Sequence, residues 1–333
     1  MTAAIIDGRN LSQMIRKNIS EEVALFKKEG TSPCLATVRV GDDPASMIYL
    51  RMKHRSCEEV GIKSSDFHLP ANATEKELLE LIEELNEKRD VHGILVQIPL
   101  PQHIDSFDVV RAIDPEKDVD GLHPFNMGSI SYKRFNLAPC TPTGIMVMLS
   151  RYRIPIEGKH AVIISRSTLV GKPLNLFLSR VEPAQMLLFN TDILLLNADA
   201  TVTTCHSKTV DLEKFTKDAD ILISAVGQRR LPRTLEKELD PSSGGAGEEG
   251  FIITGRMIKK NAAVFDVGVS RIEGKVYGDV DFESVIRKAA YVTPNPGGVG
   301  PMTVTMLLYN TLIATGMQTD RQLAYGVKEL FEP

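Results

Sequence analysis

The sequence predicts an α/β protein built from two domains. Three observations support this fold class: strand-like and helical runs alternate over residues 34–98, the alternation starts again near residue 160, and a chain of 333 residues exceeds most single domains. Alternation of this kind is typical of a parallel sheet covered by helices. We expect residues 1–147 and 302–333 to form one domain and residues 148–301 the other.

In the first half of the chain, each expected element has a local signal. Residues 34–40 form a β-rich run, and Pro44 suits the first position of the helix that follows, where no backbone N–H is needed. Thr74 and Glu77 have the spacing of a capping box before an amphipathic helical run. The apolar run at residues 93–98 predicts a buried strand.

The second half of the chain repeats this pattern. A strand at residues 160–164 leads through a loop into a helix, and residues 240–250 have the Gly- and Ser-rich composition of a flexible surface loop. After a turn-rich segment, an apolar helix is expected over residues 303–315. Further strands are expected at residues 200–204, 221–226, 263–267 and 291–293.

Composition limits the classes of function. The net charge of −4 and the lack of a Lys/Arg stripe argue against nucleic-acid binding. No apolar run reaches the roughly 20 residues that span a bilayer, and the first residues lack the features of a targeting leader. The four cysteines lie far apart without metal-ligand spacing, so we expect reduced thiols, no metal site and a cytoplasmic protein.

Three side chains of one helix indicate a ligand site. Ser46, Tyr49 and Lys53 are spaced by three and four residues, so they share a helix face. A hydroxyl, an aromatic ring and an amine beside a strand end suit a site that holds a flat polar ligand and moves protons. The alternative is an ordinary solvated helix face, and the spacing alone does not decide between them.

Gln97 and Asp120 extend this site. Gln97 ends the buried strand at the carboxyl edge of its sheet, where open α/β sheets bind ligands, and Lys53 offers a donor to its amide. Asp120 precedes Gly121 in a loop, and its carboxylate can accept two N–H groups from a planar aminopyrimidine. The alternative for Asp120 is a side chain that only shapes the turn.

Residues 165–173 lie where a strand turns into a helix, which places helix N–H groups at a ready anion site. NAD-binding folds usually carry an acid at the end of the next strand, against the ribose 2′-hydroxyl. Residues 203–208 contain no acid, whereas Arg166, His206 and Ser207 suit a 2′-phosphate, so NADP is favoured over NAD. The alternative is a basic surface loop.

Six motifs occur in the order found in one enzyme family. They lie at residues 49–53, 93–101, 114–121, 139–144, 166–173 and 294–303. Together they resemble the bifunctional methylenetetrahydrofolate dehydrogenase/methenyltetrahydrofolate cyclohydrolase family over nearly the whole chain. The resemblance implies an N-terminal α/β folate-binding domain and a Rossmann-type NADP-binding domain that face each other across a cleft. It also implies homodimers formed through the Rossmann domain.

Site residues follow from the resemblance together with the patterns above. Catalytic roles fall on Lys53, Gln97, Tyr49 and Asp120, with the tyrosine stacking on the folate ring and the aspartate holding the pterin. Further substrate contacts are expected at Ser46, Pro296, Gly297 and Gly298. Cofactor contacts are expected at Thr143, Ser165, Arg166, Ser167, His206, Ser207 and Val269.

The implied reaction is NADP-dependent oxidation of 5,10-methylenetetrahydrofolate, followed by hydrolysis of 5,10-methenyltetrahydrofolate to 10-formyltetrahydrofolate, in one-carbon metabolism and purine biosynthesis. Lys53 is the residue expected to transfer protons during the hydrolysis. The alternatives are a monofunctional NAD(P)-dependent dehydrogenase of the same fold, a shikimate- or amino-acid-type dehydrogenase, and a non-enzymatic NADP-binding protein. The joint presence of the lysine, glutamine and aspartate motifs disfavours them.

Three features depart from the family pattern. Ser165 stands where the family usually has glycine, and its β-carbon can push the backbone away from the pyrophosphate. The segments near residues 177–197 and 229–255 are longer than is common. All three fall in the expected cofactor domain.

Overall fold

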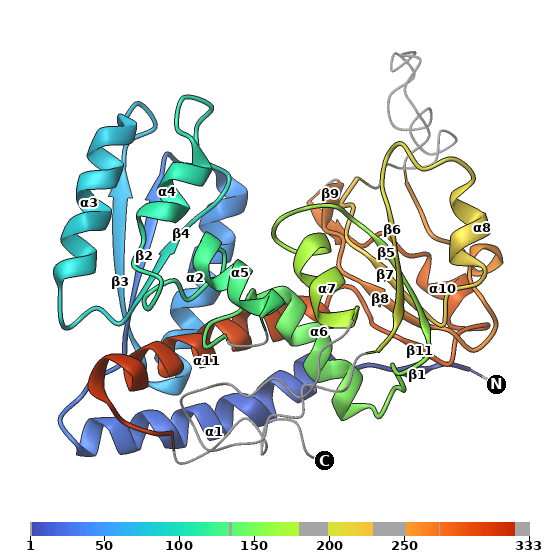
Figure 1. Ribbon diagram of the computed structural model, residues 1–333, viewed down its shortest axis with the longest axis horizontal. Coiled ribbons are helices and arrows are strands. Elements are labelled where there is room, and N and C mark those ends of the chain that lie inside the picture. Colours follow the sequence, from blue (N-terminus) through green and yellow to red (C-terminus); the bar gives the residue numbers. More distant parts are fainter. Residues whose placement is uncertain (1, 133–134, 180–198, 229–250, 273, 324–333) are drawn as a thin grey trace. The chain divides into compact units, whose positions relative to one another are not determined.

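The computed structural model describes residues 2–132, 135–179, 199–228, 251–272 and 274–323 (Figure 1). With these gaps, the described residues form two compact units, which we name after their sheets. The three-stranded unit comprises residues 10–147 and 302–323. The six-stranded unit comprises residues 2–9, 148–179 and 199–301.

The sheet of the three-stranded unit is parallel throughout, as the alternation of strands and helices predicts. β2 (Cys34–Val40) lies between β3 (Lys63–Leu69) and β4 (Gly93–Val96), so that Val38 is opposite both Phe67 and Val96. The helices that fall mainly in this unit are α1 (Gly8–Lys28), α2 (Pro44–Val60), α3 (Glu75–Glu87), α4 (Ser106–Ala112), α5 (Pro124–Ser131), α6 (Cys140–Arg151) and α11 (Val299–Thr319).

Helix α3 shows how a local sequence pattern leads to a capped helix with a buried apolar face. The Thr74 side chain accepts a hydrogen bond from the backbone N–H of Glu77, and the Glu77 carboxylate accepts one from the backbone N–H of Thr74. The predicted capping box is therefore confirmed. The apolar face of the helix, with Leu78, Ile82 and Leu85, is fully buried in a cluster with residues of β2 and β4. Burying each such side chain contributes about 1.5–3 kcal/mol.

Helices α1 and α11 lie side by side in the three-stranded unit (Figure 1). The Arg16 guanidinium of α1 donates a hydrogen bond to the Thr305 hydroxyl of α11 at 3.0 Å. Beyond the end of α11, Arg321 pairs with the buried Glu22 carboxylate at 2.8 Å. The last described helix therefore packs along the first, although the two are far apart in the sequence.

The six-stranded sheet is also parallel, in the order β1-β11-β8-β7-β5-β6. The chain runs from β5 to its neighbour β6 and then crosses to β7 on the other side of β5. The switch point lies between β5 and β7, and open α/β sheets bind ligands beyond the strand ends at such a point. The strands are β1 (Ala4–Ile5), β5 (His160–Ile164), β6 (Thr201–Cys205), β7 (Ile221–Ser224), β8 (Ala263–Asp266) and β11 (Tyr291–Val292).

The core of this unit explains why its inner strands β5, β7 and β8 read as continuous apolar runs. Val162, Leu222, Val264 and Val292, one from each of four neighbouring strands, are completely buried in one cluster. Strands covered on both faces have no polar side to alternate with. Around the sheet lie α7 (Gly171–Leu178), α8 (Leu212–Thr216), α10 (Phe282–Val285), the 3-10 turn Gly255–Met257, and the antiparallel pair β9 (Ser270–Ile272) and β10 (Lys275–Tyr277).

The structure differs from the expected domain ranges at the start of the chain. The sequence places residues 1–147 together, but β1 pairs in parallel with β11, with Ala4 opposite Tyr291, so residues 2–9 belong to the six-stranded unit. Main-chain pairing between such distant segments leaves no signal in local periodicity.

The ends of other elements also differ from expectation. The helix expected over residues 303–315 runs from Val299 to Thr319, because Pro301 falls in its first turn, where proline is tolerated. The expected loop at residues 240–250 lies outside the described residues, as does most of the segments 177–197 and 229–255. No described helix is both long and apolar enough to cross a membrane.

Candidate active site

Lys53 and Gln97 form the centre of the site in the three-stranded unit. Lys53 lies in α2, Gln97 directly follows β4, and the lysine Nζ donates a hydrogen bond to the glutamine Oε1 at 3.0 Å. Both side chains are half-buried. The glutamine Nε2 donates to the backbone oxygen of Ile98 at 2.7 Å, which turns its oxygen toward the lysine. The amine thus has a neutral partner whose orientation is fixed.

Asp120 lies beside the end of β4. A parallel bridge joins Asp118 to Ile94, and the Ile94 N–H donates to the Lys117 oxygen at 2.8 Å. Asp120 follows two residues later, in a turn closed by the hydrogen bond from the Gly121 N–H to the Asp118 oxygen at 3.1 Å. The Asp120 side chain is half-buried, which leaves part of it accessible to a ligand.

Asp118, not Asp120, holds the turn by conventional hydrogen bonds. Its Oδ2 accepts from the His123 backbone N–H at 2.7 Å and from the Asn126 Nδ2 at 2.8 Å. Burial raises the pKa of Asp118 above its usual value, and the hydrogen bonds from Asn126 and His123 oppose that rise. Asp118 therefore shapes this turn.

Asp120 and Lys53 both influence the pKa of the buried Cys140 thiol. Its Sγ donates to the Val119 backbone oxygen at 3.3 Å. Burial raises the pKa of the Cys140 thiol well above its usual value, the Asp120 carboxylate raises it further, and the Lys53 charge lowers it. Both charged side chains thus act on one buried atom. The structure brings the predicted lysine and glutamine into contact, and Cys140 is a neighbour that sequence reasoning missed.

The backbone of α2 places Ser46 and Tyr49 about two turns and one turn before Lys53, on the face that their spacing predicts. The helix begins at Pro44, as expected. The positions of the Ser46 and Tyr49 side chains are outside what the structure describes.

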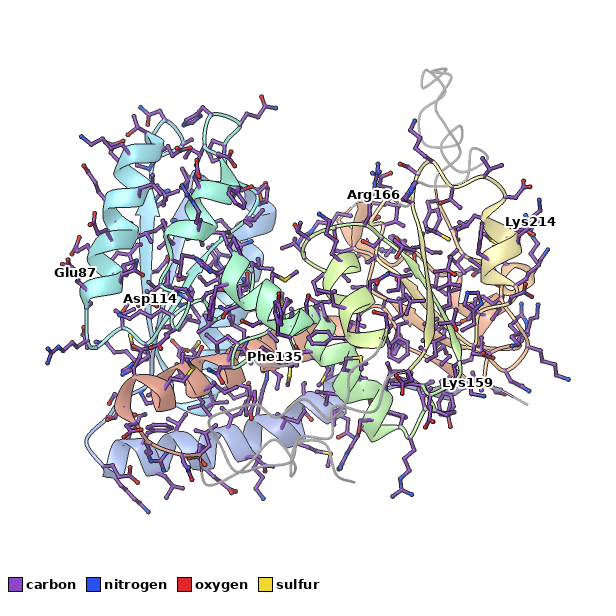
Figure 2. All side chains as sticks on the ribbon, viewed as in Figure 1. Glu87, Asp114, Phe135, Lys159, Arg166 and Lys214 are labelled. Atoms are coloured by element: carbon purple, nitrogen blue, oxygen red, sulfur yellow. The ribbon has the colours of Figure 1, made fainter. Side chains whose placement is uncertain are left out.

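The expected cofactor residues extend from two neighbouring strands of the six-stranded unit. β5 and β6 are parallel, with Ile164 opposite Cys205, so the segments that follow them leave the sheet side by side. Arg166 and Ser207 are exposed and His206 is half-buried. Figure 2 shows Arg166 at the opposite end of this sheet from Lys159, which precedes β5. Residues 206–210, after β6, contain no carboxylate.

The side chains of Ser165 and Ser167 contact each other, and that of Ser167 also contacts the backbone at the start of α7. Their hydroxyl oxygens lie 3.2 Å apart, and the Ser167 oxygen accepts the backbone N–H of Val170 at 3.1 Å and of Gly171 at 3.4 Å. The sequence predicts that helix N–H groups here are available to an anion. In the structure the Ser167 hydroxyl accepts hydrogen bonds from two backbone N–H groups at this turn, that of Val170 just before α7 and that of Gly171 at its first residue.

Asp279 fixes the loop that follows β7, next to the predicted contact Val269. Its buried carboxylate accepts hydrogen bonds from the Ser224 hydroxyl at 2.8 Å and from the backbone N–H groups of Val226 at 2.7 Å and Gly227 at 2.9 Å. A β-carbon at Gly227, whose φ is +64°, would lie 3.1 Å from the Val269 oxygen. Sequence patterns do not single out Asp279, because its three partners are distant in the chain.

The remaining predicted residues divide between the two units. Thr143 lies in α6 in the three-stranded unit, and its hydroxyl donates to the Pro139 oxygen at 2.8 Å. The turn 296–298 follows β11 in the six-stranded unit, where the Gly297 oxygen accepts the Arg9 N–H at 2.9 Å. Gly297 has a φ of +113°, a conformation that favours glycine.

Comparison with known proteins decides the family. Residues 6–120 match the family model described as tetrahydrofolate dehydrogenase/cyclohydrolase, catalytic domain, and residues 139–238 and 244–319 match its NAD(P)-binding domain. The chain belongs to the tetrahydrofolate dehydrogenase/cyclohydrolase family. The resemblance carried by the six motifs is thereby confirmed, and so is the two-domain α/β fold class.

Members of the family are similar to the chain over nearly its full length. It is 45% identical to the bifunctional protein FolD of Nitrosopumilus maritimus over 320 residues, which is 96% of this chain and 99% of the relative. A crystal structure of FolD from Campylobacter jejuni has a TM-score of 0.80 at 42% identity, covering 95% of this chain and 99% of that one. A Trypanosoma brucei enzyme complexed with NADP and an inhibitor has a TM-score of 0.81 at 35% identity, covering 96% and 99%.

Family membership makes this chain an enzyme of the tetrahydrofolate dehydrogenase/cyclohydrolase type with an NAD(P)-binding domain. Lys53, Gln97 and Asp120 fall in the part that matches the catalytic domain. Arg166 and His206, with the other residues expected at the ends of β5, β6 and β8, fall in the part that matches the NAD(P)-binding domain. At these adjacent strand ends Arg166 is exposed and His206 is half-buried, and residues 206–210 contain no carboxylate.

Proposed function

We propose that this enzyme oxidises 5,10-methylenetetrahydrofolate to 5,10-methenyltetrahydrofolate and hydrolyses the product to 10-formyltetrahydrofolate. The observation that carries this proposal is the hydrogen bond between Lys53 and Gln97, in the part of the chain that matches the catalytic domain of the family. A dehydrogenase that did not hydrolyse its product would need the folate-binding carboxylate. It would have no use for a lysine amine held by a neutral amide.

In the oxidation, the work of the protein is mainly to align the reacting carbon with a hydride acceptor. The folate nitrogens stabilise the cation that results, so no side chain has to take up charge. NADP, when bound, accepts the hydride. Asp120 would hold the aminopyrimidine end of the folate through two N–H groups, and Tyr49 would stack on the ring system.

In the hydrolysis, water adds to the methenyl carbon and the ring opens, which requires proton transfers. Lys53 is the proposed proton carrier, acting at Nζ. Its partner Gln97 orients the amine without adding a negative charge, so the lysine can gain and lose a proton without breaking an ion pair. Within the described residues, Lys53 forms no ion pair with a carboxylate.

For the cofactor, we propose NADP in preference to NAD. Arg166, His206 and Ser207 would hold the 2′-phosphate at the ends of β5 and β6, because the segment after β6 lacks the acid that an unmodified ribose hydroxyl usually meets. Ser165, Ser167 and Val269 would line the rest of the dinucleotide site. Thr143 and the turn 296–298 are proposed as further contacts, to the cofactor and to the folate respectively.

We also propose that the enzyme acts in the cytoplasm, in one-carbon metabolism that supplies purine biosynthesis, and as a homodimer through its six-stranded unit. All four cysteines are free thiols, which fits a reducing compartment. The net charge of −4 fits a protein whose partners are small molecules, not nucleic acids or membranes. The dimer follows from the family resemblance alone.

One assay tests the two-step proposal. The purified protein is mixed with 5,10-methylenetetrahydrofolate and either NADP or NAD, and both the reduced-cofactor absorbance and 10-formyltetrahydrofolate are measured over time. A parallel reaction that starts from 5,10-methenyltetrahydrofolate without protein gives the background hydrolysis. We expect NADPH and enzyme-dependent 10-formyltetrahydrofolate. Reduced cofactor with only background hydrolysis would establish the monofunctional alternative, and no cofactor reduction would exclude both.

A further inference from the structure

Asn310 is a buried residue whose side-chain amide forms hydrogen bonds outside its own helix. It lies in α11 among apolar residues and is 4% exposed. Two nearby buried threonines satisfy their hydroxyls within the helix: Thr311 donates to Leu307 and Thr315 donates to Thr311. Asn310 instead donates from its Nδ2 to the backbone oxygens of Val119 at 2.8 Å and Ala138 at 2.9 Å.

Both of these carbonyl groups belong to segments of the folate side of the site. Val119 directly precedes Asp120, and Ala138 lies two residues before Cys140. The segments pack backbone to backbone, because a β-carbon on Gly121 would overlap the Ala138 carbonyl. The Cys140 Sγ donates to the same Val119 oxygen and lies 3.6 Å from the Asn310 Nδ2. One amide group therefore joins the Asp120 turn to the start of α6.

We propose that Asn310 is a positioning residue for Asp120. By holding the Val119 carbonyl group, directly before Asp120, to the segment before α6, it sets where the Asp120 carboxylate meets the folate. The inference rests on the proposed folate-binding role of Asp120. Removing the two donors deprives the Ala138 oxygen of its Asn310 contact and leaves the Val119 oxygen with the weak thiol donor of Cys140. Separation of the two segments would let both oxygens regain hydrogen bonds to water.

Asn310→Asp is the decisive variant because it keeps the size of the side chain and changes its hydrogen-bonding character and its charge. Its ionised carboxylate would face two carbonyl oxygens and add negative charge near Asp118 and Asp120. When protonated, the same side chain offers one O–H donor and restores one of the two contacts. A positioning role therefore predicts a loss of folate affinity that is partly reversed at low pH.

The matched control is Thr311→Val, the next residue of the same helix. Thr311 is fully buried, and its hydroxyl bonds only within α11 at 2.9 Å, so the variant disturbs the helix without touching the aspartate turn. The measurements are the KM values for 5,10-methylenetetrahydrofolate and NADP, and kcat, for the wild type and both variants between about pH 6 and about pH 8.

At about pH 8 we expect Asn310→Asp to raise the folate KM about tenfold or more, with the NADP KM changed less than about twofold. At about pH 6 the folate KM should move back toward the wild-type value. Thr311→Val should leave both KM values close to wild type. If Asn310→Asp does not fold, Asn310→Ser, which keeps one neutral donor, should show the same folate-specific loss without pH-dependent recovery.

An equal loss of affinity for both ligands, a loss with no recovery at low pH in a folded Asn310→Asp protein, or the same loss in Thr311→Val would show that Asn310 is only a structural residue. Asp120→Ala separates the two levels of the proposal. If Asp120→Ala weakens folate binding and Asn310→Asp does not, the positioning inference fails alone. If Asp120→Ala has no effect on folate binding, the proposed role of Asp120 is wrong, and the inference falls with it.

Discussion

The Lys53 amine and the Gln97 amide, which belong to different elements separated by 44 residues, form a 3.0 Å hydrogen bond at the end of β4. The contact pairs a group that can carry a proton with one that cannot. An ion pair in its place would hold the lysine permanently charged. The neutral partner orients the amine without adding a negative charge beside it.

The first prediction separates the two activities. Lys53→Met removes the proton carrier and keeps much of the side-chain volume, so cyclohydrolase activity should fall by about 100-fold or more while dehydrogenase activity stays measurable. Both rates are followed in one reaction, with NADP affinity as the control for an intact cofactor domain. Equal loss of the two activities with unchanged NADP affinity would contradict this division of labour.

The second prediction concerns Asp120. Asp120→Ala removes a carboxylate proposed to accept two N–H groups of the pterin, so folate affinity should fall about tenfold to 100-fold. NADP affinity should stay within about twofold of the wild-type value. Separate titrations of the two ligands check this, and parallel losses for both ligands would place Asp120 in a general structural role.

The third prediction tests cofactor choice. Arg166→Ala should raise the KM for NADP about tenfold or more, because a charge-assisted contact to the 2′-phosphate is lost, and should leave the KM for NAD nearly unchanged. Steady-state kinetics with each cofactor give the ratio. An unchanged ratio would mean that the 2′-phosphate is held by other residues.

The fourth prediction is a pH dependence of stability at Asp266. Burial raises the pKa of this carboxyl group from 3.8 to about 6, and the neighbouring Asp279 carboxylate adds to the rise. The folded protein therefore binds the proton more tightly than the unfolded chain. The free energy of unfolding contributed by this group falls as the pH rises from about 4 to about 6, by up to about 3 kcal/mol.

Other carboxyl groups change the total stability in the same range, so the comparison is between wild type and Asp266→Asn, whose amide does not titrate. The difference in free energy of unfolding, wild type minus variant, should decrease between about pH 4 and about pH 6 and stay constant above it. Urea unfolding at several pH values measures this. A difference that is constant over the whole range would show that Asp266 titrates normally in the folded protein.

Local sequence signals determined much of the fold and the chemical identity of the site. Periodicity and spacing predict the capping box of Thr74 and Glu77, the start of α2 at Pro44 and the apolar strands of both sheets. These features depend on residues that are neighbours in the sequence. The missing acid after β6 is likewise a local observation. Lys53, Gln97 and Asp120 were also found this way, because each lies in a short motif next to a predicted strand or helix.

Only the tertiary structure decided which distant groups meet. β1 pairs with β11 in the six-stranded sheet, and the Ser167 hydroxyl accepts the backbone N–H of Val170. Asn310 donates to a carbonyl group next to Asp120. In each case a polar group satisfies its hydrogen bonds with whatever the fold brings near it. A sequence pattern indicates which residues of a segment are buried. The hydrogen-bond partner of a buried polar group is determined only when the chain packs.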